Sequence, residues 1–444
     1  MITRIAQLVP EFPSSSETFI VGQIIGLLDR GVDVEILAAY RPWSEPVIHP
    51  EVKEFDLMSR TRYIEMPDAS AMELSVWPIS GVTWMPGEVK PIRNAKRVWA
   101  ATPTIARAAL AAPRLTRDLV DPRHYGDAAR SLSAIYRFRA LRTLRGRYDV
   151  VHAHFGPVAN DFRFAPAALG AALIVTFHGY DFSSWPREHG AAAYQDLFRI
   201  ARAITVNSRY AEQQLIGLGC PAVKVVRLNV GIDVGRFEFA PIKAVDDKVR
   251  ILTVGRLVPK KGMSDAILAL SKARQVNTRL CLEIIGDGPL RTALTDLVSD
   301  LGLDEWVTFY GPRDSTFVRT AMKRAHVFVL ASRTAPDGDQ EGTPVVLMEA
   351  MASGLPVIST RHSGIPEIVK DGVSGVLVGE GDVDALAASM VKLASDRTIR
   401  ERLAQSARAY VERNHDLPAV TDQLISLYAS TASTSSDMRP RDVD

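Results

Sequence analysis

Residues 341–364 read Glu-Gly-Thr-Pro-Val-Val-Leu-Met-Glu-Ala-Met-Ala-Ser-Gly-Leu-Pro-Val-Ile-Ser-Thr-Arg-His-Ser-Gly. The residues just before this stretch, 325–330, form a short apolar run that predicts a buried strand, and 355–360 predict another. The segment between the two strands has the length and pattern of a helix. Two strands joined by a helix make a βαβ unit, so this stretch predicts a parallel sheet and an α/β fold.

The expected helix has a clear start and a clear end. Thr343 stands at the expected N-cap and Pro344 at the first helical position, while Gly354 and Pro356 follow the last turn. A helix that opens with a Gly-Thr-Pro loop at the carboxyl end of a strand presents free backbone N–H groups and the positive end of its dipole. Gly342, Thr343 and Pro344 are therefore candidate ligands for an anion.

Two carboxylates flank this anion site. Glu341 precedes it, and Glu349 follows about six residues along the helix, about 9 Å from the helix start. Taken singly, Glu341 would be a solvated loop residue and Glu349 a charge on a helix surface. Glu349 is flanked by leucine, methionine and alanine, however, so its carboxylate needs a partner. A carboxylate on each side of an anion site matches the layout of a sugar nucleotide, with its sugar, diphosphate and ribose.

The pattern Glu-Gly-x-Pro-x-x-x-x-Glu-Ala-Met-Ala-x-Gly-x-Pro-Val, which 341–357 contain, resembles the retaining GT-B glycosyltransferases of family 4. The resemblance implies an α/β protein in which two Rossmann-like domains face each other across a cleft. It also implies transfer of a sugar from a UDP or GDP sugar to a hydroxyl acceptor with retention of configuration. Glu349 is then placed for the ribose, which leaves Glu341 near the sugar.

The N-terminal half opens as another α/β unit. A strand is expected over 2–9, a helix over 17–30 and a second strand over 32–38. The loop before the helix lacks Gly-x-Gly-x-x-Gly, which argues against a nicotinamide enzyme. It contains Ser-Glu-Thr-Phe instead, a form similar to the exopolysaccharide branch of family 4 that includes the colanic acid transferases. Ser16 and Glu17 are candidate acceptor or donor ligands, or Ser16 only caps the helix.

Histidines stand at the ends of two further expected strands. The strand over 149–154 ends at His154, and the strand over 172–177 is followed by His178. Functional groups collect at such carboxyl ends, so we expect His154 to face the cleft, whereas His152 lies inside the strand and is expected to pack. The family resemblance implies that His178 reaches the donor sugar. No thiol or acid cluster accompanies the histidine pair, so we expect no metal there.

The C-terminal half places cations and glycines after its strands. The strand expected over 249–254 is followed by Gly-Arg-Leu-x-x-x-Lys-Gly, a string that the family shares. In this string Arg256 suits a diphosphate as a bidentate donor and Lys261 as a point charge. By resemblance, the glycines that follow three successive strands belong to the donor pocket: Gly255, Gly286 and Gly311.

A metal site and rival activities fit the sequence less well. Asp337 and Asp339 spell the Asp-x-Asp that holds a divalent ion in the other glycosyltransferase fold, but here they precede Glu341 in a GT-B pattern, so we expect no metal and no cofactor.

Arg256, Lys261 and the helix dipole would stabilise the leaving diphosphate, whose oxygen takes the acceptor proton. The alternatives are a GT-B nucleotide-sugar epimerase and a sugar-nucleotide-binding protein without catalysis.

The length of 444 residues predicts two domains. We expect an acceptor-side domain at 1–235, a nucleotide-sugar domain at 236–414, and a helix at about 415–430 that returns to the first domain. Residues 431–444 are expected to form a disordered tail. No run of about 18 apolar residues and no signal peptide pattern occurs, and the two cysteines lack metal or redox spacing, so we expect a cytoplasmic protein.

A basic segment interrupts the first half. Residues 90–147 hold fourteen lysines and arginines against three acids, which gives a net charge of +11 in a chain whose total is +2. Such a block is either a solvated face or a contact for an anionic membrane or a polyanionic substrate. Nucleic acid is not expected, because no recognition motif accompanies the charge. Exopolysaccharide transferases of this type use lipid-linked acceptors, so we expect the 137–147 run to meet a membrane surface at the cytoplasmic face.

Overall fold

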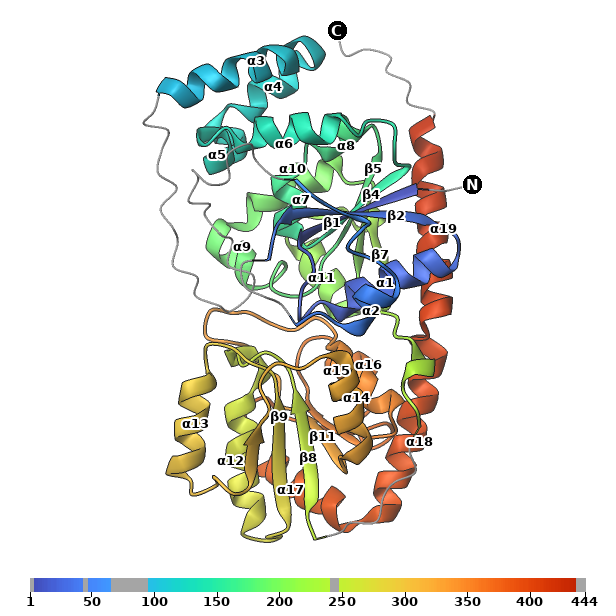
Figure 1. Cartoon of the computed structure of the whole chain (residues 1–444). Coiled ribbons are helices and arrows are strands. Elements are labelled where there is room, and N and C mark those ends of the chain that lie inside the picture. The colour runs from blue at the N-terminus through green and yellow to red at the C-terminus, as the bar shows by residue number, and fades with distance from the viewer. Residues whose placement is uncertain (1–3, 43–46, 65–94, 240–246, 437–444) are drawn as a thin grey trace.

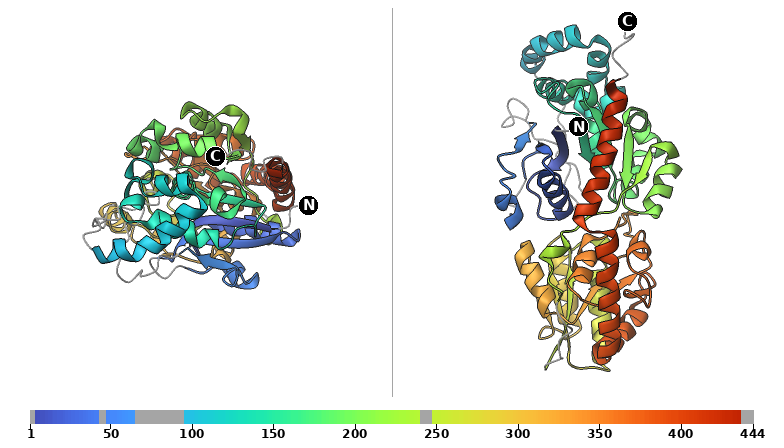
Figure 2. Two further views of the ribbon diagram at one scale, coloured as in Figure 1. Left: turned by 90° about the horizontal axis from the view of Figure 1, so that it is seen from above. Right: turned by 90° about the vertical axis from the view of Figure 1, so that its right-hand side faces the viewer.

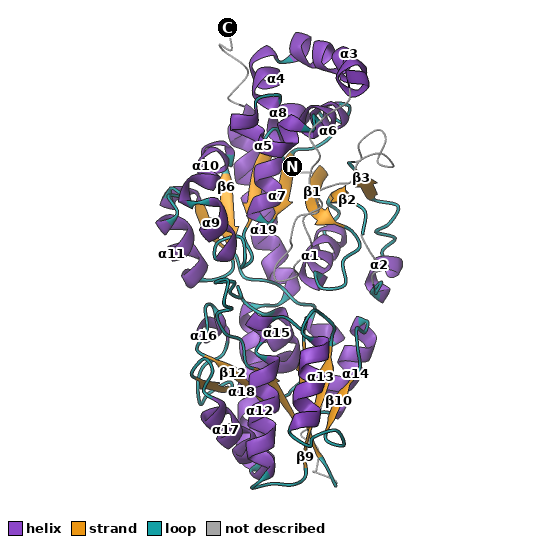
Figure 3. Cartoon of the chain, turned by 90° about the vertical axis from the view of Figure 1, so that its left-hand side faces the viewer, coloured by secondary structure: helices purple, strands orange, loops and turns teal. Residues whose placement is uncertain are grey.

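The computed structural model describes residues 4–42, 47–64, 95–239 and 247–436. It consists of two α/β domains stacked end to end, each built on a parallel sheet with helices on both faces (Figures 1 and 3). The two Rossmann-like domains predicted from the sequence are therefore confirmed.

The first domain contains a seven-stranded sheet in the order β3-β2-β1-β4-β5-β6-β7, with all neighbours parallel. The strand order reverses between β1 and β4, and ligands of doubly wound sheets bind at the carboxyl side of such a point. The strands are β1 (Arg4–Glu11), β2 (Asp33–Tyr40), β3 (Thr61–Tyr63), β4 (Val150–His154), β5 (Ala172–Thr176), β6 (Ala203–Val206) and β7 (Val225–Arg227). The predicted first strand began at residue 2, which lies outside the described residues.

Helices α3 to α6 stack at the end of the first domain that points away from the second domain (Figure 1). They carry the described part of the basic segment; residues 90–94 lie outside the described residues. The helices of this domain are α1 (Thr18–Asp29), α2 (Pro50–Glu54), α3 (Ala95–Ala111), α4 (Pro113–Leu119), α5 (Pro122–Arg130), α6 (Ser133–Arg142), α7 (Gly156–Asp161), α8 (Ala165–Leu169), α9 (Ser184–His189), α10 (Gln195–Ile200) and α11 (Arg209–Gly217).

The second domain contains a six-stranded sheet in the order β10-β9-β8-β11-β12-β13. Its strands are β8 (Val249–Val254), β9 (Leu280–Ile285), β10 (Val307–Phe309), β11 (Val327–Leu330), β12 (Val357–Thr360) and β13 (Val376–Val378). Its helices are α12 (Met263–Arg274), α13 (Arg291–Asp300), α14 (Ser315–Arg324), α15 (Val345–Ala352), α16 (Ile365–Ile368), α17 (Val383–Ser395) and α18 (Arg397–Asn414). β11 pairs parallel with β12, so the predicted βαβ unit around α15 is confirmed.

The last two helices, α18 and α19 (Leu417–Ser436), run along both domains. α18 packs on α15 in the second domain, and α19 continues along the first domain against α1, β4 and β5 (Figure 2). α1 and α19 approach closely at Gly26, where a Cβ atom would lie 2.3 Å from Thr421 Oγ1. The returning helix predicted from the sequence is thus confirmed.

The predicted disordered tail is wrong for residues 431–436, which are helical. The hydroxyl of Thr431 is buried and donates to the carbonyl of Leu427, so this polar side chain is satisfied within the helix. Residues 437–444 lie outside the described residues. Among the described residues, no helix has the length and apolar character that a membrane span requires.

Candidate active site

The carboxylate of Glu341 and the ammonium of Lys261 form a buried ion pair with a distance of 2.7 Å between Oε1 and Nζ. Lys261 ends the short 3₁₀-helix Pro259–Lys261 that follows β8, and Glu341 lies in the loop between β11 and α15. Burial opposes ionisation of Glu341, but the ammonium groups of Lys261 and Lys260 outweigh it and lower the pKa of Glu341 to about 2. Two residues that the sequence assigned to the same site are therefore brought together as charged groups.

The backbone of Glu341 is held from both sides by the residues that follow β12. The N–H of Glu341 donates to Nε2 of His362 at 3.1 Å, and the hydroxyl of Ser363 donates to the carbonyl of Glu341 at 2.6 Å. His362 is fully buried, and its Nδ1 atom lies 2.7 Å from Oε1 of Glu380. Since Nε2 accepts, Nδ1 carries the proton and donates to Glu380. His362 was not predicted from the sequence, although its position just after a strand is a signal that could have identified it.

Helix α15 begins one residue later than predicted. Pro344 occupies the N-cap in an extended conformation, so Thr343 precedes the cap and does not supply it. The Thr343 hydroxyl is buried and has no hydrogen-bond partner among the described residues. Gly354 follows the helix with a φ of 80°, as the sequence predicted. The loop from Gly342 to Pro344 thus still presents the N-terminus of α15 beside Glu341.

Glycines link the loops that follow β8, β9 and β10. The N–H of Gly255 donates to the carbonyl of Ile285 at 3.0 Å, and the N–H of Gly286 donates to the carbonyl of Gly311 at 2.9 Å. A Cβ atom on Gly286 would lie 1.9 Å from the carbonyl oxygen of Gly255, so only glycine allows this approach. The three predicted donor-pocket glycines therefore lie together at one edge of the sheet.

The second domain meets the first at the turn that carries His178. A Cβ atom on Gly179 would lie 2.8 Å from the carbonyl oxygen of Gln340, and one on Gly342 would lie 2.1 Å from the carbonyl oxygen of His178. The carboxylate of Asp181 fixes this turn by accepting the N–H groups of His178 at 2.9 Å and Gly179 at 2.7 Å. The backbone of His178 is thereby placed against the loop that follows Glu341. The role that the family resemblance implied for its side chain, contact with the donor sugar, stays a prediction.

His154 does not face the cleft, which corrects the prediction for this residue. Its ring is completely buried behind His178, with 3.1 Å between Nδ1 of His154 and Nε2 of His178. The reason is that α19 and the Gln7 side chain of β1 cover the end of β4. His152 is also completely buried and bonds Tyr428 of α19, so its predicted packing role is confirmed.

The first loop contributes Glu17 to the boundary between the domains. Glu17 is buried, and burial together with the charge of Glu11 raises its pKa to about 8, while the guanidinium of Arg256 acts in the opposite direction. Arg256 is thus close enough to Glu17 to influence it from the other domain. Ser16 is exposed and does not cap α1, because Glu17 occupies the N-cap position and no side chain caps it. The capping alternative for Ser16 is therefore wrong.

Glu349 is half-buried on α15, and burial raises its pKa to about 7. Arg319 of α14 lowers this pKa and Glu51 of the first domain raises it. Arg319 is therefore a nearby cation for Glu349, whose apolar sequence neighbours predicted that its carboxylate needs a partner.

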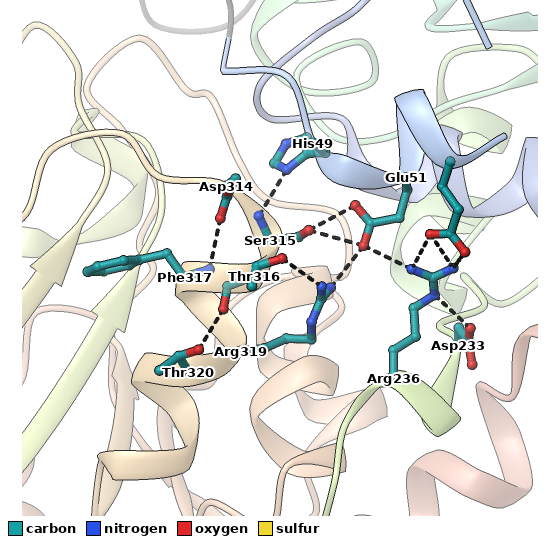
Figure 4. A network of polar contacts seen from close by, with 11 residues as sticks. His49, Glu51, Asp233, Arg236, Asp314, Ser315, Thr316, Phe317, Arg319 and Thr320 are labelled. Carbon is teal, nitrogen blue, oxygen red and sulfur yellow. Dashed lines mark hydrogen bonds and ion pairs between the residues drawn. The ribbon is translucent and has the colours of Figure 1, made fainter. Parts of the chain in front are cut away.

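Arg319 belongs to a polar network between the domains (Figure 4). Nη1 of Arg319 lies 2.9 Å from Oε1 of Glu51, and the hydroxyl of Ser315 donates to the same carboxylate. On the other side of Glu51, Arg236 binds both Glu51 and Glu54 of α2. This network could not be predicted from the sequence, because residues 41–147 contain no pattern that places α2 beside α14.

The Asp-x-Asp string is tied into the loop before Glu341. The carboxylate of Asp339 pairs with Nζ of Lys260 at 2.9 Å, and both side chains are buried. A carboxylate oxygen of Asp337 accepts the backbone N–H of Asp339 at 2.9 Å. Within the described ranges, no group of three or more histidine, cysteine or acidic side chains is arranged to hold a metal ion.

Comparisons with known proteins identify the family of this chain. The family model for glycosyl transferases group 1 matches residues 236–410, and that for Glycosyltransferase Family 4 matches residues 93–236. The chain is 33% identical to a putative colanic acid biosynthesis glycosyltransferase, WcaL of Salmonella typhimurium, over 96% of this chain and 99% of that protein. It is 32% identical to the amylovoran biosynthesis glycosyltransferase AmsK of Erwinia amylovora, over 90% of this chain and 93% of that protein.

Among solved structures, Anabaena Alr3699/HepE in complex with UDP and glucose has a TM-score of 0.68 at 16% identity, and the match covers 96% of this chain and 99% of that one. This likeness concerns the fold. Two parallel-sheet domains with a charged site where they meet therefore define a glycosyltransferase of the GT-B fold. The chain belongs to the family 4 glycosyltransferases.

Proposed function

We propose that this glycosyltransferase moves a sugar from a nucleoside-diphosphate sugar to a hydroxyl group of a lipid-linked saccharide, with retention, during exopolysaccharide synthesis. The observation that carries the proposal is the buried pair of Lys261 and Glu341 at the N-terminus of α15, opposite His178 of the first domain. A cation, a helix N-terminus and a carboxylate at one point suit a diphosphate joined to a sugar.

The donor would lie along the carboxyl edge of the second sheet. Arg256, Lys261 and the N–H groups of the Gly342 loop would bind the diphosphate, and Glu349 would accept hydrogen bonds from the ribose hydroxyls. HepE, which shares the fold, has been solved with UDP and glucose. The loops at Gly286 and Gly311 offer mainly backbone groups to a base, so UDP and GDP sugars both remain candidates.

The proposed reaction is a front-face substitution. The bond between the anomeric carbon and the diphosphate oxygen breaks, and the acceptor oxygen bonds the anomeric carbon on the same face. The acceptor proton passes to the departing phosphate oxygen, so the diphosphate itself serves as the base. Arg256, Lys261 and the α15 dipole stabilise the charge that grows on the diphosphate. We propose that no metal ion takes part, because these groups supply the positive charge.

The acceptor is proposed from the relatives, which are named for colanic acid and amylovoran biosynthesis. We propose that the enzyme reaches a lipid-linked acceptor by binding the cytoplasmic face of the membrane. The 137–147 run, which the sequence suggested for this contact, is only partly suited to it. Arg137 is buried between the rings of Tyr40 and Phe162, with 5.0 Å from its guanidinium carbon to each ring centre.

Helices α3 and α4 offer a better membrane contact. Arg107, Arg114 and Arg117 are exposed on them, and the side chain of Leu110 is 88% exposed. Exposed basic side chains on the same two helices as an exposed apolar one suit an anionic lipid surface. These helices also lie at the end of the molecule farthest from the second domain (Figure 1).

The function is tested by incubating the protein with UDP and GDP sugars and a lipid-linked saccharide fraction, while free nucleoside diphosphate is measured. We expect release that requires both the acceptor and one particular donor. Conversion of the donor into an epimer would identify an epimerase, and tight binding without release would identify a sugar-nucleotide-binding protein.

A further inference from the structure

Three histidines form a row that leads from the core of the first domain to the active site. The rings of His152 and His154 stack with centres 4.7 Å apart, and those of His154 and His178 stack with centres 5.4 Å apart. His154 touches His178 through one hydrogen bond, with 3.1 Å between Nδ1 and Nε2. His178 is the last member of the row, on the turn that meets the Gly342 loop, and its ring lies between the rings of Phe19 and Phe155.

The other ring nitrogen of His154 determines the direction of that bond. Nε2 of His154 lies 2.9 Å from Oε1 of Gln7 and 3.4 Å from the amide nitrogen of Gln23, so Gln7 is its closer partner. The amide of Gln7 has two further partners: its Nε2 donates to the Tyr428 hydroxyl at 3.2 Å, and its Oε1 accepts from the amide nitrogen of Gln23 at 3.4 Å. The carbonyl oxygen of an amide only accepts, so Nε2 of His154 carries the proton and Nδ1 of His154 is the acceptor. Nε2 of His178 must therefore donate to it.

His178 is neutral and carries its single ring proton on Nε2. Burial lowers the pKa of His178 to about 3 and holds that of His154 well below its usual value, so both rings are neutral and carry one proton each. With its proton on Nε2, His178 has a lone pair on Nδ1. No described residue hydrogen-bonds this Nδ1 atom. It is therefore available to a ligand as an acceptor only.

We propose that Gln7 and His154 are positioning residues that hold His178 as a hydrogen-bond acceptor, so that the site selects a donor sugar with a hydroxyl group at this point. The proposal rests on the proposed function, in which His178 reaches the donor sugar. A hydroxyl donates to the lone pair of Nδ1, whereas a deoxy position leaves it unpaired. The side chain of Gln7 on β1 hydrogen-bonds Tyr428, Gln23 and His154, which all lie outside the second domain's sheet. Its effect on the donor would therefore pass through the two histidines.

The first test is nitrogen-15 NMR of the histidine rings in the full-length protein without substrate, with His178 assigned by the loss of its signals in His178→Gln. We expect an unprotonated Nδ1 and a protonated Nε2 in the wild type. In His154→Phe and Gln7→Met, His178 should shift to a mixture of both tautomers. The control is His189→Phe, the same kind of change at an exposed histidine of α9, and it should leave the tautomer of His178 unchanged. A protonated Nδ1 in the wild type would overturn the proposal, whether or not any variant folds.

The second test compares the donor with its monodeoxy analogues. In the wild type, removing one hydroxyl should lower kcat/KM about tenfold, the value of one neutral hydrogen bond. In His154→Phe and Gln7→Met this ratio should fall to about 1–2, whereas Gln7→Glu, whose carboxylate still accepts from His154, should keep it. An unchanged ratio in His154→Phe would contradict the proposal. Absence of transfer from every donor would instead reject the proposed function and leave the NMR result standing.

Discussion

Lys261 and Glu341 face each other as a buried ion pair, with 2.7 Å between Nζ and Oε1, although they come from loops after different strands. Each charge is stabilised by the other, because removing one partner of a buried ion pair lowers the free energy of unfolding by about 3–5 kcal/mol. This pair links the stability of the second domain to the proposed catalytic site.

We expect Lys261→Met to destabilise the protein by about 3 kcal/mol, because it leaves the Glu341 carboxylate unpaired. The double variant Lys261→Met/Glu341→Gln should regain most of that stability, since it buries no charge. Turnover should stay low in both, because the leaving diphosphate loses its cation. Urea unfolding and steady-state kinetics check this pattern. If the double variant recovered its activity along with its stability, Lys261 would have a structural role only.

Glu349 should control nucleotide affinity through its ionisation. Its pKa is raised to about 7, so the fraction of ionised carboxylate increases about tenfold between pH 6 and pH 8. If the ionised form accepts the ribose hydroxyls, affinity for the nucleoside diphosphate should rise over the same range in the wild type relative to Glu349→Gln. Isothermal titration calorimetry of both proteins measures this. The diphosphate titrates in the same way in both experiments, so the ratio of the two affinities reports the effect of Glu349 alone.

Replacing Glu349 should mainly affect nucleotide affinity, whereas replacing Glu341 should mainly affect turnover. Glu349→Ala should weaken binding of the nucleoside diphosphate, since a charged acceptor contributes about 1.5–3 kcal/mol per hydrogen bond. Glu341→Ala should lower turnover more than this affinity. Equal losses of nucleotide affinity in the two variants would refute the division of roles.

Glu17 should make the protein less stable as the pH rises. Its pKa is about 8 in the folded chain against an ordinary value of 4.5 in the unfolded chain, so between these values the unfolded chain loses a proton that the folded chain keeps. Stability is therefore fully present below pH 4.5 and declines up to about pH 8, by at most about 1.4 kcal/mol per pH unit. Glu17→Gln should remove this part of the slope. Parallel stability curves for the wild type and the variant would show that Glu17 does not titrate in this way.

Binding to anionic membranes is expected to depend on α3 and α4. Each basic side chain near an anionic leaflet contributes about 1 kcal/mol, screened over about 8–10 Å. The full-length protein should sediment with anionic but not zwitterionic liposomes, and rising salt should release it. Arg107→Glu/Arg114→Glu/Arg117→Glu should abolish binding, whereas a matched triple reversal on α18, Arg397→Glu/Arg402→Glu/Arg413→Glu, should not. Equal binding by the two triple variants would contradict this surface.

Sequence reasoning predicted the elements whose signals are local. Helix α15 and the glycines after β8, β9 and β10 carry caps, turns and a strand period that can be recognised along the chain. Lys261 and Glu341 were assigned to one site because the strings that contain them, Gly-Arg-Leu-x-x-x-Lys-Gly and Glu-Gly-x-Pro, both resemble strings of the family.

What the sequence did not predict depends on contacts between distant segments. His362 supports Glu341 from another loop, and Glu51 meets Arg319 across the domain boundary. The burial of His154 depends on α19, which lies far from His154 in the sequence. No local pattern encodes such contacts, so these residues could be found only once the two domains and α19 were placed.

Retaining transfer from a nucleoside-diphosphate sugar is tested by proton NMR of one complete reaction, in which the donor, the nucleoside diphosphate and the anomeric proton of the new linkage are followed together. We predict that nucleoside diphosphate appears as donor disappears, and that the product keeps the anomeric configuration of the donor. A product of inverted configuration, or a donor that persists in the presence of the lipid-linked acceptor, would contradict this prediction.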